Sequence, residues 1–213
     1  EATLNGQPVT TANTNDSDEG IFILEDPTTG ERIQLPDTAN GATMGYPATR
    51  RLIPSVYDIY YANGGTTTFW PINNNHVLYK NASFMSASTF VIDTPTIDAT
   101  FDVTLAGQPV TTANTNDSDE GIMILEDPST GERIQLPDTA NGATMGYPAT
   151  RRLIPSVYDI YYANGGTTTF WPINNNHVLQ SNTSFTTSST YVVDVPVVDL
   201  TFEASRPTTV EEV

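Results

Sequence analysis

Two acidic, amide-rich loops carry the densest sets of oxygen ligands in the sequence. Each reads Asn-Thr-Asn-Asp-Ser-Asp-Glu-Gly, at 13–20 and again at 114–121. Hard cations such as Ca²⁺ prefer oxygen ligands, so a calcium site is one interpretation. The loop departs from an EF-hand in its glycine and in its twelfth position, and the pattern favours the alternative, a solvated acidic turn before a strand. The candidate ligands are Asn13, Asn15, Asp16, Asp18, Glu19, Asn114, Asn116, Asp117, Asp119 and Glu120.

Aromatic residues form a second candidate site, a stacking surface for sugar rings. They lie at 57, 60, 61, 69 and 70, and aromatic faces combine apolar contact with a polar group. Alternation along 55–61 places Tyr57 and Tyr61 in the core. The candidate glycan ligands are then Tyr60, Trp70 and their counterparts Tyr161 and Trp171, and the favoured alternative is that this site binds nothing.

The sequence has two histidines, His76 and His177, and each follows three asparagines. Acid-base or metal chemistry needs a second ligand or an orienting carboxylate, and the adjacent sequence has neither, so turn contacts are the favoured interpretation. The Arg-Arg pairs at 50–51 and 151–152 are expected to pair with carboxylates, and between modules they would help to fix register. The sequence shows no triad, metal motif or phosphate loop, which predicts that the protein is not an enzyme and needs no organic cofactor.

The charge balance excludes several classes of partner. There are 25 Asp and Glu residues against 8 Lys and Arg, a net charge of −17. Nucleic acid binding requires clustered cations, and an anionic membrane surface would repel this chain. Membrane insertion is not expected either, because no apolar run approaches the roughly 20 residues that cross a bilayer. The sequence contains no cysteine, which excludes disulfides and thiolate metal sites.

The elements that must position these residues occur twice. An offset of 101 residues aligns Gly6 with Gly107 without a gap, and up to Leu78 the copies differ only at Phe22/Met123 and Thr28/Ser129. After Leu78 they diverge but keep register. The joint at 96–105 alternates apolar and polar residues, so we expect the last strand of one copy to run almost directly into the first strand of the next. A joint without a Gly/Ser spacer is expected to be stiff.

Turn signals divide each copy into about seven short strands, the number expected of a two-sheet sandwich. Asp26-Pro27-Thr28-Thr29-Gly30 predicts a hairpin, because Pro fixes φ and Gly accepts a positive φ. Helix should be scarce, since no window shows a 3.6-residue apolar period. The prediction is an all-β protein with two tandem Ig-like or prealbumin-like antiparallel β-sandwich domains, 1–101 and 102–213, the second with a C-terminal extension.

Two segments also resemble a known family. Leu52-Ile53-Pro54-Ser55-Val56-Tyr57-Asp58-Ile59-Tyr60-Tyr61 and the opening Thr3-Leu4-Asn5-Gly6-Gln7-Pro8-Val9 are similar to strands of transthyretin-like or carboxypeptidase-regulatory-like β-sandwich repeats of bacterial surface proteins. The resemblance implies a prealbumin-like spacer or adhesive module and brings no catalytic residues. We therefore expect a structural repeat of an extracellular or cell-surface protein, an adhesin stalk or filament. Its partners would be neighbouring repeats or identical subunits, and a glycan- or host-surface-binding module is the alternative.

Overall fold

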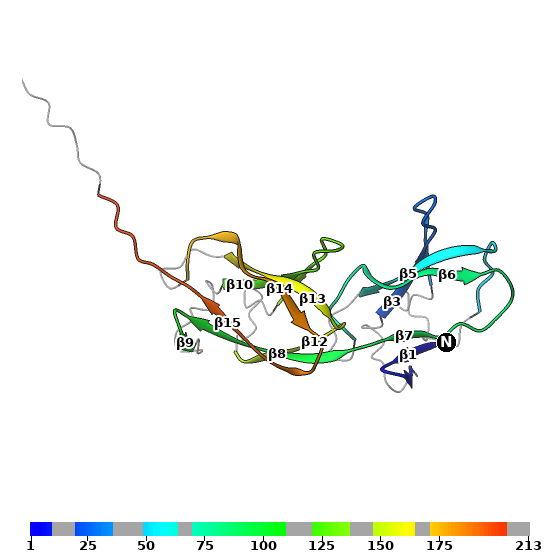
Figure 1. Cartoon of the computed structure of the whole chain (residues 1–213), viewed down its shortest axis with the longest axis horizontal. Coiled ribbons are helices and arrows are strands. Elements are labelled where there is room, and N and C mark those ends of the chain that lie inside the picture. Colours follow the sequence, from blue (N-terminus) through cyan, green and yellow to red (C-terminus); the bar gives the residue numbers. More distant parts are fainter. Residues whose placement is uncertain are drawn as a thin grey trace, which may run out of the picture.

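The computed structural model describes residues 1–9, 20–35, 49–63, 70–109, 121–136, 147–164 and 171–203. In this part of the chain every regular element is a strand, as the sequence predicted (Figure 1). The first copy contributes β1 (Ala2–Leu4), β2 (Gln7–Pro8), β3 (Gly20–Glu25), β4 (Arg32–Gln34), β5 (Ser55–Asn63), β6 (His76–Phe84) and β7 (Ile92–Thr94). The second contributes β8 (Ile97–Leu105), β9 (Gln108–Pro109), β10 (Gly121–Glu126), β11 (Arg133–Gln135), β12 (Ala149–Leu153), β13 (Ser156–Asn164), β14 (Asn175–Phe185) and β15 (Ser189–Val195). The described residues include no helix that is long and apolar enough to span a membrane.

The predicted pair of tandem antiparallel sandwiches, Ig-like or prealbumin-like, is wrong. The described strands form four small sheets instead, ordered β2-β1-β7, β4-β3-β5-β6, β11-β10-β13-β14 and β12-β8-β15, with β9 beside β8. Two of these sheets contain a parallel pair, β1 with β7 and β8 with β15. Alternation shows which side chains face inward, but it does not show which distant strand lies alongside or in which direction it runs.

The local predictions fare better than the global one. β3 and β4 form the expected hairpin, and its turn is closed because Asp26 Oδ1 accepts from the Thr28 amide at 2.8 Å while Gly30 adopts a φ of 71°. Along β5 the expected inward face is buried, since Tyr57 and Tyr61 are 4% and 0% exposed. These features depend on neighbouring residues alone, which is why the sequence predicts them.

Each copy encloses its own cluster of buried side chains. The first is built on Phe22, Leu24, Tyr57, Ile59, Tyr61 and Trp70, and the second on the equivalents Met123, Leu125, Tyr158, Ile160, Tyr162 and Trp171. Met123 is as fully buried as Phe22, whose ring lies 6.3 Å from those of Tyr61 and Trp70. A flexible methionine fills the space of a phenylalanine with little disturbance, so the one difference in this part of the core is tolerated.

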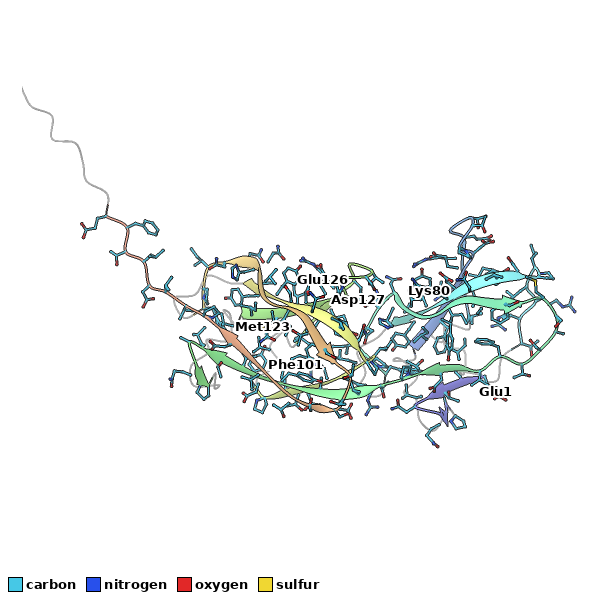
Figure 2. All side chains as sticks on the ribbon, viewed as in Figure 1. Glu1, Lys80, Phe101, Met123, Glu126 and Asp127 are labelled. Carbon is cyan, nitrogen blue, oxygen red and sulfur yellow. The ribbon has the colours of Figure 1, made fainter. Side chains whose placement is uncertain are left out.

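The joint between the copies is a strand of the second cluster. Only Pro95 and Thr96 separate β7 from β8, as the lack of a spacer predicted. Ile97, Ala99 and Phe101 of β8 are all buried in the second cluster, although the predicted boundary assigned them to the first domain. Figure 2 shows Phe101 in the interior of the second half of the molecule. The division into 1–101 and 102–213 itself stays a prediction.

Candidate functional site

The two copies meet by exchanging isoleucines across their junction. Ile72 of the first copy packs against the second cluster, and Ile154 of the second copy packs against the first. Ile154 is 2% exposed, whereas its equivalent Ile53 is 80% exposed. Burying an isoleucine side chain contributes about 1.5–3 kcal/mol, so the exchange stabilises one relative placement of the two copies.

A fully buried asparagine holds the centre of this junction. Asn73 Nδ2 donates to the Tyr158 hydroxyl at 2.7 Å, and Asn73 Oδ1 accepts from the Ile154 amide at 2.7 Å. The Tyr158 hydroxyl in turn donates to the Ile154 carbonyl at 2.8 Å. A backbone bond from the Ile72 amide to the Arg152 carbonyl, 2.9 Å long, lies beside them. Buried polar groups are costly unless paired, so this network specifies how the copies fit together.

Ionisable groups surround the asparagine. His76 Nδ1 lies 3.3 Å from Asp127 Oδ2, and the Asn74 amide donates to the Glu132 carboxyl. Asp127 belongs to the β10–β11 turn of the second copy, and Figure 2 shows it where the two halves meet. The histidine therefore has the carboxylate partner that its own sequence neighbourhood lacks. The predicted turn contacts are therefore not the whole role of His76, because its carboxylate partner comes from the other copy.

Burial at the junction shifts the pKa of two of these groups. It raises the pKa of the Glu132 carboxyl from 4.5 to about 8, because the charged form loses its hydration. Burial also lowers the pKa of the His76 imidazole, an effect that the nearby Asp127 carboxylate opposes. Glu132 is therefore largely protonated and His76 largely neutral at pH 7 when the copies are docked.

An ion pair ties the joint strand to the junction. Arg152 Nε lies 2.9 Å from Asp98 Oδ1, and its Nη2 donates to Oδ2 at 3.3 Å. Bidentate geometry of this kind fixes direction as well as distance. The expectation that the Arg-Arg pairs bind carboxylates is confirmed for Arg152, whereas Arg50 and Arg151 each donate to the carbonyl of the preceding threonine.

A polar groove of about 710 Å³ runs along the outside of the junction. The first copy contributes Arg32, Tyr60, His76 and Lys80, and the second contributes Asp127 and Thr130. The Arg32 guanidinium lies 4.7 Å above the Tyr60 ring and is held by Glu25 at 2.6 Å. Because the guanidinium covers one face, only part of this ring is available to a sugar.

The remaining candidate residues lie in the cores, at the partly buried Tyr161, or outside the described residues. Trp70 and Trp171 are buried, so neither belongs to a surface that stacks sugars. Tyr161 is only partly buried and carries the Arg133 guanidinium at 4.8 Å, as Tyr60 carries Arg32. All ten candidate calcium ligands lie outside the described residues. Within the described residues no group of three or more His, Cys, Asp or Glu side chains is placed to hold a metal ion.

Sequence reasoning missed the residues that join the copies, above all Ile72, Asn73 and Ile154. One signal was available: Ile53 and Ile154 each precede a proline and lie outside the alternating segment that starts at the following serine. An apolar residue without a place in a strand face points to a contact beyond its own module.

Neither a protein-family model nor a curated protein matches the chain. Among solved structures, the Bacillus anthracis TIE protein is similar to 92% of this chain over 33% of its own length, with 12% identity and a TM-score of 0.28. A leucine-rich repeat protein from Bacteroides thetaiotaomicron is similar to 92% of this chain over 26% of its own, with 12% identity and a TM-score of 0.26. The chain thus spans about a third and a quarter of these two proteins. Likenesses this weak carry no argument about fold or function.

Proposed function

We propose that the chain is a structural repeat segment of an extracellular surface protein, an adhesin stalk or filament in which copies stack end to end. The reciprocal packing of Ile72 and Ile154 against the core of the other copy carries this proposal. A flexible linker lets modules swivel, whereas packed isoleucines and the bonds of Asn73 hold them in one orientation. Such a fixed junction suits a spacer, since each added copy extends the same direction.

The wider setting belongs to the same proposal. The extracellular location rests on the resemblance of Leu52–Tyr61 to strands of bacterial surface repeats. The high negative charge suits a solvated surface structure. The partners are neighbouring repeats or identical subunits, and the role requires no catalytic step.

Small-angle X-ray scattering of the whole chain tests the proposal. We expect an elongated particle whose scattering shows no sign of swivelling modules, and a compact globule would contradict it. The Ile72→Asp variant should loosen the junction and give the profile of two modules on a flexible joint. Its matched control is Ile173→Asp, because Ile173 is the exposed equivalent in the second copy and should leave the profile unchanged.

A glycan-binding role is the second candidate, and the polar groove favours it. Tyr60 offers part of a ring beside Arg32 and Lys80, a combination that suits sugar hydroxyl and acid groups. A glycan array with Tyr60→Ala and Tyr161→Ala tests this role, because only Tyr60 lies in the groove. Binding that is lost in the first variant alone would support a site at the junction.

A further inference from the structure

Each repeat carries a sequence motif that the proposed function does not use. Asn81-Ala82-Ser83 and Asn182-Thr183-Ser184 are Asn-x-Ser triplets, the acceptor pattern for N-linked glycans, and they are equivalent at the 101-residue offset. They lie where the copies have diverged, since from 79 to 83 the copies share only the asparagine and the serine of this triplet. Because such triplets also arise by chance, the surroundings of the asparagines decide whether they are suited to be acceptors.

Both triplets lie on the last strand of a sheet. β6 ends the sheet ordered β4-β3-β5-β6, and β14 ends the sheet ordered β11-β10-β13-β14. Among the described strands, neither has a paired neighbour on its outer side. The outer edge of such a strand presents its backbone to other proteins. With respect to the described strands, each triplet is therefore open to a modifying enzyme along one side.

A β-bulge fixes the backbone of each asparagine. Asn81 and the residue before it lie opposite Asp58 alone, which is the two-against-one pattern of a bulge. Asn81 has a φ of 57°, and its backbone amide donates to Asp58 Oδ1 at 2.7 Å. In the second copy Asn182 has a φ of 53°, and its amide donates to Asp159 Oδ1 at 2.7 Å. These bonds use the backbone amide, so they leave the side-chain nitrogen Nδ2 free to react.

The two side chains that define the triplet share an exposed face. Asn81 and Ser83 are exposed, whereas Ala82 between them is half-buried and packs against the core of the first repeat. The equivalent asparagine and serine of the second repeat are exposed as well. Residues two apart in a strand lie on the same face. The acceptor amide and the hydroxyl that a transferase recognises therefore lie together, away from the core.

The fold by itself accounts for the asparagine but not for the serine. A positive φ at the bulge favours asparagine or glycine, so Asn81 has a structural reason to be there. Ser83 occupies an exposed strand position, which accepts many residue types. The middle residue is alanine in one copy and threonine in the other, and the triplet allows any residue but proline there. The shared serine is thus the part of the pattern that points to modification.

We propose that Asn81 and Asn182 are N-glycosylation sites that accept an oligosaccharide from a polyprenyl diphosphate carrier. The asparagine Nδ2 forms a bond to the anomeric carbon of the first sugar and loses one proton to the transferase. The bond between that carbon and the diphosphate oxygen breaks, and the polyprenyl diphosphate leaves. This inference rests on the proposed extracellular location, because transfer of this kind accompanies export. Similar triplets at Asn15 and Asn116 lie outside the described residues and are not included.

A glycan at these positions also has a physical consequence for the sheets. The open edges of β6 and β14 are templates for pairing with another chain. An N-linked glycan is bulky and strongly hydrated, so it covers the edge from which it projects. Glycosylation at Asn81 and Asn182 would therefore keep neighbouring proteins from adding strands to these two sheets.

Peptide mapping by mass spectrometry, on the protein isolated from its own organism, tests the inference. We expect the peptides that contain Asn81 and Asn182 to carry sugar masses, and fragmentation should place the sugar on the asparagine. An unmodified asparagine at either position would overturn the inference. Sugar attached to Ser83 or Thr183 in place of the asparagine would overturn it too.

Variants produced in the same organism separate the triplet from the fold. Ser83→Ala keeps the asparagine at the bulge but removes the hydroxyl, so the glycan at Asn81 should be lost while that at Asn182 remains. Ser83→Thr should retain both glycans, and so should Ser86→Ala, a change at another exposed serine of the first repeat. Sugar that persists on Asn81 in the Ser83→Ala variant would contradict the inference. A protein without sugar that is elongated in scattering would still leave the proposed function standing.

Discussion

Ile53 and Ile154 lie in identical stretches of sequence and have opposite surroundings. Ile53 faces solvent, and Ile154 is buried against the core of the other repeat. One local contact is the same at both positions, since the Tyr57 and Tyr158 hydroxyls donate to the carbonyls of these isoleucines at 2.9 and 2.8 Å. What differs is whether a neighbouring repeat supplies an asparagine and an apolar wall. The environment of such a residue therefore depends on contact with the neighbouring repeat.

The largest expected effect compares these isoleucines. Ile154→Ala should lower the free energy of unfolding by about 2–4 kcal/mol, because it removes buried contacts and leaves a cavity at the junction. Ile53→Ala should change it by less than about 0.5 kcal/mol, since the side chain is exposed. Urea unfolding followed by tryptophan fluorescence measures both. Equal effects would show that the two sites do not differ as the structure states.

A smaller effect separates Asn73 from Asn174. Asn73→Leu leaves the Ile154 amide and the Tyr158 hydroxyl without their partner, which should cost about 1–3 kcal/mol. Asn174 is exposed, so Asn174→Leu is the matched control and should be nearly neutral. Thermal unfolding measures both variants. Equal melting temperatures for Asn73→Leu and Asn174→Leu would argue against the buried network.

The pH dependence of the junction gives a third contrast. A carboxyl whose pKa is raised from 4.5 to about 8 binds its proton more tightly in the docked state, so docking is fully supported below pH 4.5 and loses support as the pH rises to about 8. His76 acts in the opposite sense below its usual pKa of 6.5, so the test belongs between pH 6.5 and about 8. The melting temperature of the unaltered protein should fall as the pH rises over this range. In the Glu132→Gln variant it should fall less, because the glutamine does not ionise.

Glu31→Gln is the control for this contrast, because Glu31 is the exposed equivalent in the first repeat. It should leave the slope of melting temperature against pH unchanged. A slope that survives in Glu132→Gln would show that another group causes it.

The smallest effects are expected where the repeats do not differ. Arg32 and Arg133 each bind a glutamate, at 2.6 and 2.5 Å, and each donates to an asparagine at 2.8 Å. Arg32→Ala and Arg133→Ala should each cost about 0–1 kcal/mol, as exposed ion pairs do. Thermal unfolding of the two variants should agree within error, and a clear difference would reveal a further asymmetry between the repeats.

Part of the candidate site followed from residue patterns and part did not. The binding of a carboxylate by one arginine of the second Arg-Arg pair was predictable from the charge balance, and Arg152 shows it. The role of Asn73 was not, because three consecutive asparagines look like a turn. The prediction of Trp70 as a glycan ligand was wrong. Aromatic residues occur both on sugar-binding surfaces and in cores, and only the packing shows that Trp70 is buried.

The sequence alone determined that the chain is all-β and duplicated at an offset of 101 residues, with a hairpin at Asp26–Gly30 and an inward face along β5. These features arise from alternation and turn chemistry within a few residues. The tertiary structure decided that the strands form four sheets with parallel pairs, and that Ile72 and Ile154 cross the junction. Such contacts join residues far apart in the chain, and their energy depends on burial and shape that no local pattern encodes.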